Sequence, residues 1–141
     1  MNRVLPKLSG YVTKVFRVHS QNHPELADVH QLFNTLKTEL EQHTIQEETS
    51  IFPKIKEYEN NPSQDQLTEI QNEIKALERE HDQSGSILKQ LRMVTNDYTL
   101  PPDACTTYRL TYQKLQELES DLFQHIHLEN NILFRRLNKN K

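Results

Sequence analysis

The chain has 141 residues, a length that suits one domain, which we expect to span residues 1–141. The mean hydropathy of −0.84 argues against a membrane span, and the first ten residues lack the apolar core of a secretory signal. The net charge of −3, with no basic block, argues against nucleic acid as a partner, and a single cysteine, Cys105, makes a reducing cytoplasm the default expectation.

Four amphipathic helices are predicted, because apolar residues recur at alternating steps of three and four. The two glycines are too few for the turns of an all-β domain of this length. In chain order, the four apolar stripes are Leu5, Leu8, Val12 and Val15; Leu26, Val29, Phe33, Leu36 and Leu40; Leu67, Ile70, Ile74, Leu77, Leu88 and Leu91; and Tyr108, Thr111, Leu115, Leu118, Leu122 and Ile132.

Turn and capping residues divide these stripes. Ser63 followed by Gln66 forms a capping box at the start of the third helix, and the prolines at 101 and 102 separate the third helix from the fourth. Pro53 lies inside the second helical stretch, so a kink or an early end is expected near Phe52. The short connections favour antiparallel neighbours and predict an all-α, up-down-up-down four-helix bundle.

Polar residues interrupt the apolar stripes at inward positions. His43 and Glu47 are separated by one helical turn, as are His125 and Glu129, so each pair can reach one site. His81 adds a third imidazole from the facing helix. Burying carboxylates without partners is costly, and two metal ions about 3.5–4 Å apart would fit this span. Nitrogen and oxygen ligands without thiolate suit iron, manganese or zinc, and carboxylates able to bridge favour a dinuclear iron site.

The same five residues also permit a metal-free polar network, in which each buried group satisfies another. The remaining histidines are excluded as ligands by their height or direction on the predicted helices, and Cys105 lies about 30 Å along the helix from the site. These excluded histidines are His19 and His23 at the first hairpin, His30 low in the bundle, and His127 pointing away from His125.

Counting residues from the third connection leaves one discrepancy. If the third helix ends near 95 and the fourth begins near 103, His81 lies opposite residue 117 and not opposite His125. We therefore expect residues 96–102 to run along the bundle axis, or the helix boundaries to differ.

Five segments, in order and covering nearly the whole chain, resemble the hemerythrin-like HHE domain, specifically the iron–sulfur cluster repair di-iron proteins. The segments are Leu5-Pro6-Lys7-Leu8 through Val18-His19; His43-Thr44-Ile45-Gln46-Glu47-Glu48 followed by Ile51-Phe52-Pro53-Lys54-Ile55; Glu80-His81-Asp82 with Gly85; Pro101-Pro102-Asp103-Ala104-Cys105-Thr106-Thr107; and His125-Ile126-His127-Leu128-Glu129-Asn130-Asn131 with Leu133-Phe134. The resemblance implies two non-haem iron ions with a bridging oxygen. It also implies Glu47 and Glu129 as bridging carboxylates and His43, His81 and His125 as terminal ligands.

The resemblance implies a role in restoring iron–sulfur clusters damaged by nitric oxide or oxidants, by donating iron. The partners would be damaged cluster proteins and small gases, nitric oxide and dioxygen. A module that binds or senses these gases is the alternative, and nitric oxide reduction, a purely structural bundle and a homodimer also stay open. An oxygen carrier is disfavoured, because Leu77 and Gly85 stand where such carriers place a second histidine beside the equivalent of His81.

The chain departs from the family pattern near its start. The family carries a further histidine upstream of the Leu5-Pro6 segment, and many repair proteins carry a small cysteine-bearing N-terminal domain; this sequence contains neither, so we expect a truncated first helix. A site with fewer ligands should release iron more readily. Its metal affinity should fall below about pH 6, because protonated imidazole does not bind metal.

Overall fold

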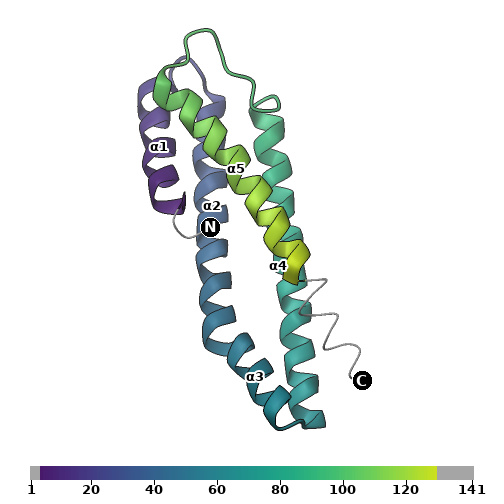
Figure 1. The fold of residues 1–141 in the computed structure, drawn as a ribbon. Helices are drawn as coiled ribbons and strands as arrows, with labels where there is room; N and C mark the ends of the chain where they lie inside the picture. Colours follow the sequence, from purple (N-terminus) through teal and green to yellow (C-terminus); the bar gives the residue numbers. More distant parts are fainter. Residues whose placement is uncertain (1–3, 130–141) are drawn as a thin grey trace.

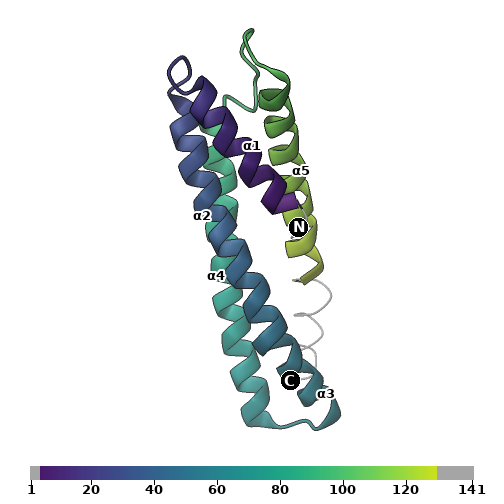
Figure 2. The ribbon, with the colours of Figure 1, turned by 90° about the vertical axis from the view of Figure 1, so that its left-hand side faces the viewer.

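The computed structural model describes residues 4–129, and every regular element in that range is helical (Figure 1). In chain order the elements are α1 (Val4–His19), α2 (Glu25–Gln46), η1 (Glu47–Ile51), α3 (Phe52–Asn60), α4 (Gln64–Val94) and α5 (Thr106–Leu128). α2, η1 and α3 form one bent rod antiparallel to α4, and α1 and α5 complete the predicted up-down-up-down bundle (Figures 1 and 2). Between residues 4 and 129, no helix has the length and apolarity needed to cross a membrane.

The apolar stripes form the core, as predicted, although Ile132 lies outside the described residues. The core is divided into two clusters. The larger cluster contains the buried apolar residues of α1, of residues 26–40 in α2, of residues 87–91 in α4, and of α5. The smaller consists of Ile51, Tyr58, Leu67, Ile70, Ile74 and Leu77. A layer of buried polar residues, described below, lies between the two clusters.

The bend in the rod formed by α2, η1 and α3 begins at Glu47, six residues before Pro53. Residues Glu47–Ile51 form a π-helix, in which the Phe52 N–H donates to the Glu47 carbonyl five residues earlier. Proline has no N–H and its ring clashes with the carbonyl four residues before it, so a regular α-helix cannot continue through this position. The wider π turn absorbs Pro53 at the start of α3, and π turns of this kind recur at functional sites.

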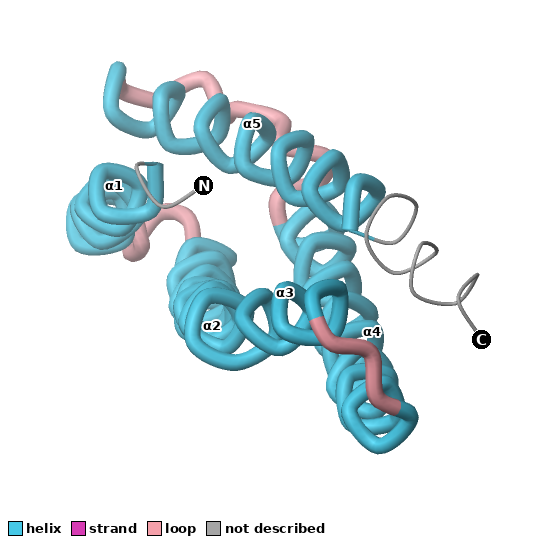
Figure 3. Tube along the Cα trace, turned by 60° about the horizontal axis from the view of Figure 1, so that its bottom comes forward, coloured by secondary structure: helices cyan, strands magenta, loops and turns pink. Residues whose placement is uncertain are grey.

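The connection from α4 to α5 runs past the end of α4 before α5 begins (Figure 1). Asn96, Asp97 and Tyr98 all have left-handed backbone conformations, with φ of 52°, 62° and 58°. The start of α5 is joined to the α1–α2 hairpin, where His23 Nε2 lies 2.9 Å from Asp103 Oδ1. α5 then crosses the bundle obliquely from α1 toward α4 (Figure 3). This path accounts for the discrepancy in height between His81 and the last helix.

Arg92 anchors the left-handed turn. Its Nε donates to both carboxylate oxygens of Glu119, at 2.8 and 3.0 Å, and its Nη1 donates to Asp97 at 2.5 Å. The guanidinium also lies 5.2 Å from the Tyr98 ring centroid. Glu119 is buried, so Arg92→Ala leaves a buried carboxylate without its cation and should lower the free energy of unfolding by about 2–4 kcal/mol.

Chemical denaturation measures this loss. Lys114 supplies the matched control, because its ion pair with Glu117 is partly exposed on the same helix as Glu119, and Lys114→Ala should cost less than about 1 kcal/mol. Equal effects of the two substitutions would show that Arg92 does not anchor the turn.

Candidate metal centre

All five residues predicted to bind metal meet in the polar layer between the two apolar clusters. α2 supplies His43, η1 begins with Glu47, α4 supplies His81, and α5 supplies His125, with Glu129 following directly after α5. Four of the five residues are buried, with exposed fractions between 3% for Glu129 and 8% for His81. The helical register therefore places these groups inward, as the sequence predicts.

Glu129 is the centre of the cluster. Its Oε1 atom lies 3.2 Å from His43 Nε2, 3.4 Å from His81 Nε2 and 2.7 Å from His125 Nε2. Glu47 Oε1 contacts His43 Nε2 and lies 3.6 Å from His125 Nε2. Four of the residues, all except His81, each offer one ligand atom within 4.8 Å of the others.

Several of these atoms are buried and close together without hydrogen-bond geometry. Among the described residues, Glu47 Oε1, Glu129 Oε2, His125 Nε2 and both ring nitrogens of His81 are buried and have no hydrogen-bond partner. Unpaired buried polar groups are rare because each costs free energy, and shared cations would satisfy those that point into the cluster. The donor set, imidazole nitrogen with carboxylate oxygen, fits iron, manganese or zinc.

The two glutamates, Glu47 and Glu129, raise the pKa values of the histidines His43 and His125. Burial lowers the pKa of His43, but hydrogen bonds and charge from Glu129 and Glu47 outweigh it and raise that pKa to about 10. Glu129 and Glu47 likewise raise the pKa of His125 to about 9, although burial opposes them. Burial raises the pKa of the Glu129 carboxyl, yet its close contacts with His125, His43 and His81 outweigh burial and hold that pKa well below the usual range. Protons on His43 and His125 therefore balance the glutamates when no cation is bound.

The stability of the metal-free protein should depend on these protons. The folded-state pKa values of His43 and His125 lie above the unfolded value of 6.5, so their contribution is complete below about pH 6.5 and is lost as pH rises through 9 to 10. With chelator present, we expect the melting temperature to fall between pH 7 and 10. Glu129→Gln should flatten this dependence, and an unchanged slope in that variant would contradict the assignment.

Glu80 supports the site from outside, and the sequence did not reveal this role. The Nδ1–H of His43 donates to Glu80 Oε2 at 3.3 Å, leaving Nε2 directed at the cluster. Carboxylates that accept the second N–H of a ligand histidine fix its tautomer and orientation. Glu80 precedes His81 on α4 and has a side chain that is 41% exposed, so no pattern of inward residues marks it.

The excluded histidines lie away from the cluster, as predicted. His19 Nε2 lies 3.3 Å from Cys105 Sγ, and His23 pairs with Asp103, both at the α1–α2 hairpin. The remaining two are His30, stacked on Phe16 at 4.7 Å, and His127, which is exposed. Asn130, Asn131, Leu133 and Phe134 of the last resembling segment lie outside the described residues.

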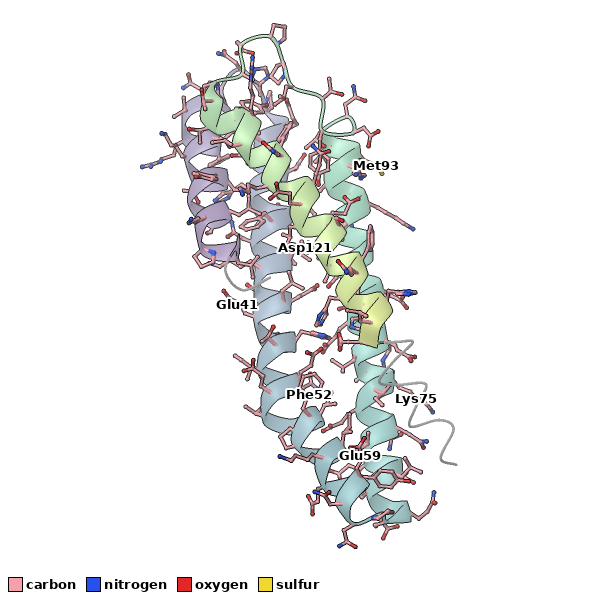
Figure 4. All side chains as sticks on the ribbon, viewed as in Figure 1. Glu41, Phe52, Glu59, Lys75, Met93 and Asp121 are labelled. Carbon is pink, nitrogen blue, oxygen red and sulfur yellow. The ribbon has the colours of Figure 1, made fainter. Side chains whose placement is uncertain are left out.

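An opening of about 420 Å³ lies between α5 and the rod formed by α2, η1 and α3, and it leads to the cluster. Glu47 and His125 line it, and the His125 side chain is 34% exposed there. Glu48 and Asp121 add carboxylates to the lining, and Phe52 adds an apolar ring; Asp121 and Phe52 are labelled in Figure 4. A cation can therefore approach two of the five residues along a lining of negative charge.

Comparison with known proteins gives consistent similarities. The family model described as the hemerythrin HHE cation binding domain matches residues 1–137. The iron–sulfur cluster repair protein ScdA of Staphylococcus haemolyticus is 35% identical over 136 residues, which are 96% of this chain and 60% of that protein. The iron–sulfur cluster repair protein YtfE of Escherichia coli O81 is 39% identical over 132 residues, 94% of this chain and 57% of that protein. The chain thus spans little more than half the length of these curated relatives.

Proposed function

Because this chain belongs to the hemerythrin HHE cation-binding domain family, we propose that it is a non-haem di-iron protein that helps to repair damaged iron–sulfur clusters by donating iron. The observation that carries the proposal is the convergence of buried, unpaired nitrogen and oxygen atoms at one level of the bundle. The proposed ligands are His43, Glu47, His81, His125 and Glu129, with the two carboxylates bridging. The free thiol of Cys105 suits a cytoplasmic location.

The ligand set favours release of iron as well as binding. Three imidazoles and two carboxylates supply fewer donor atoms than two six-coordinate ions need, so some positions stay open to water or an oxo bridge. The partly exposed ring of His125 and the carboxylates of Glu48 and Asp121 at the opening provide a path along which Fe(II) can leave as cargo. When the cargo leaves, protons bound by His43 and His125 restore the charge balance of the buried glutamates.

Iron loading tests the di-iron centre. Purified protein loaded with Fe(II) without oxygen should hold about two irons per chain, and Mössbauer spectra after oxidation should show a spin-coupled pair. Fewer than about one iron per chain would contradict the proposal.

Transfer of iron tests the repair role. A [4Fe–4S] cluster that loses one iron is left as an oxidised [3Fe–4S] cluster, which becomes [4Fe–4S] again when it gains one Fe(II) and one electron. We expect the loaded protein, mixed with such a damaged cluster protein and a reductant, to restore the cluster faster in the presence of a chelator than free Fe(II) does. Equal inhibition of both iron sources by the chelator would rule out direct donation.

A module that binds dioxygen or nitric oxide is the second candidate function. The opening to Glu47 and His125, together with the incomplete ligand set, gives a small molecule access to the site. Its signature is a spectral change on exposure to gas that reverses when the gas is removed and leaves the iron content unchanged. Turnover with an electron donor would instead indicate nitric oxide reduction.

A further inference from the structure

Side chains of the kind that bind metal recur once per turn on α5 and become steadily more buried along the helix. Asp121 is exposed, the His125 side chain is 34% exposed, and Glu129 is 3% exposed. Residues four apart lie on nearly the same face of a helix and are separated by about 6 Å of rise. Because α5 crosses the bundle obliquely, this row leads from the surface into the polar layer (Figure 3). Asp121 is therefore the outermost of the three groups, and it is not one of the five proposed ligands.

Two adjacent glutamates at the start of η1 show the same change from exposed to buried. Glu48 is exposed, whereas Glu47 is 4% exposed. Both line the opening of about 420 Å³ to which Asp121 and His125 also contribute. Glu47 Oε1 is buried and has no hydrogen-bond partner among the described residues. The opening therefore has two carboxylates at its mouth and an unsatisfied oxygen atom at its inner end.

The π turn frees a further oxygen atom at Glu48. In an α turn the Glu48 carbonyl would accept from the N–H of Phe52, but that N–H donates to the Glu47 carbonyl. In a π turn the donor would be residue 53, and a proline has no N–H. Glu48 therefore lacks the helical donor to its carbonyl and offers that oxygen in addition to its carboxylate. Carboxylate and carbonyl oxygens are ligands that hard divalent cations accept.

The charges that line this opening favour a cation. The remaining lining residues are uncharged: Thr44, Phe52, Gln124 and Leu128. Apart from His125, which carries a proton when no metal is bound because its pKa is about 9, no lining residue in the described part of the chain is cationic. A second opening of about 670 Å³, on the other flank of α5, has mixed charge, because Lys89 opposes Glu78 and Asp82 in its lining. A divalent cation is therefore attracted more strongly to the first opening.

We propose that Glu48 and Asp121 form an outer site at which a hydrated divalent cation, Fe(II) when it is the cargo, is held briefly on its way to and from the buried cluster. The inference rests on the proposed function, because the outer site serves iron that is exchanged. Oxygen donors alone suit Fe(II) less well than a set that includes imidazole, so the ion passes inward to His125 and does not stay. Since the outer residues contact the ion only in transit, they control how fast it enters and leaves and not how tightly the cluster holds it.

Rates of zinc exchange test the proposal with a redox-inert ion, with entry measured by stopped flow and exit by transfer to excess chelator. The double variant Glu48→Gln/Asp121→Asn keeps the size of both side chains and removes two charges. It should slow entry and exit by about tenfold each, so that the equilibrium affinity stays within about twofold. The matched control, Glu78→Gln/Asp82→Asn, removes the same charge at the second opening and should leave both rates within about twofold. All four substituted residues are exposed, so both variants should remain folded.

The outcomes separate this inference from the proposed function. Unchanged rates in Glu48→Gln/Asp121→Asn overturn the outer site and leave the five proposed ligands in place. Equal slowing by the two double variants also overturns it, because the effect would then come from net charge alone. A loss of equilibrium affinity of about tenfold or more would make Glu48 and Asp121 permanent ligands and would contradict a transit site. Failure of the unsubstituted protein to load Fe(II) overturns the proposed function, and this inference with it.

Discussion

Replacement of Glu129 with alanine is expected to abolish tight metal binding, lowering the affinity for iron or zinc by more than about 100-fold. The reason is geometric: its Oε1 atom lies within 3.4 Å of a nitrogen in each of the three imidazoles, so its removal takes away the carboxylate that all three share. Glu129→Gln retains the size and one carbonyl oxygen but loses the charge. Its affinity should fall between those of alanine and glutamate.

Competition with a chromophoric chelator measures these affinities, and circular dichroism confirms that the variants remain helical. Glu117→Gln is a matched control, because Glu117 lies on the same helix in a partly exposed ion pair with Lys114 and should leave metal binding unchanged. Undiminished zinc binding by Glu129→Ala would exclude the proposed site.

The companion substitution Glu47→Ala distinguishes a metal site from a metal-free polar network. In a metal-free structural network, the substitution removes one partner from a group of buried charges, so it should lower the free energy of unfolding by the same amount with and without added metal. In a metalloprotein the same substitution removes a ligand that contacts His43, so bound metal should be lost, and with it the stabilisation that metal provides. A difference in stability between the variant and the parent protein that is the same in the presence and in the absence of metal would favour the network.

The affinity for metal should fall steeply as the pH is lowered, and this fall should begin well above pH 7. Ordinary imidazoles would place this loss below about pH 6, but the glutamates raise the pKa of His43 to about 10 and that of His125 to about 9. Metal must displace both protons at pH 7. Below pH 9 the apparent affinity for zinc, a redox-inert probe, should therefore drop by about 100-fold per pH unit until the carboxylates begin to protonate.

Two measurements check this prediction. Titration against a chelator of known pH dependence between pH 6 and 9 gives the slope, and a weakly buffered titration at pH 7 should release about two protons per site filled. His19→Ala, at the far end of the bundle beside Cys105, should leave both results unchanged. A pH-independent affinity between pH 7 and 9 would mean that His43 and His125 do not both bind the metal.

Helical periodicity was sufficient to predict which five residues meet in the polar layer, because the same register that buries Leu40 and Leu122 also turns His43 and His125 inward. Periodicity fixes direction around a helix axis but not position along it. The relative height of α4 and α5 depends on three consecutive left-handed residues and on contacts such as that of His23 with Asp103, which join segments 80 residues apart. No local pattern encodes such contacts, so the height could not be predicted.

Pro53 illustrates a second limit. Its chemistry predicts an interruption of the helix, and an interruption is present, but the chain accommodates it with a π turn that begins at Glu47. The turn therefore begins at a proposed ligand and lies ahead of the proline itself. The support of His43 by Glu80 was equally hidden, because a half-exposed glutamate on a charged helix has no distinctive sequence signature.

The division of the hydrophobic core into two clusters affects how the bundle would respond to the loss of bound metal. Because separate apolar clusters lie on either side of the polar layer, loss of the proposed iron would remove interactions from the middle of the bundle and leave both clusters packed. Opening can then stay local, as in proteins whose cooperative units unfold independently. If the protein donates iron as proposed, a bundle built in this way could be emptied and refilled through many cycles, behaving as a rechargeable carrier and not as a store consumed once.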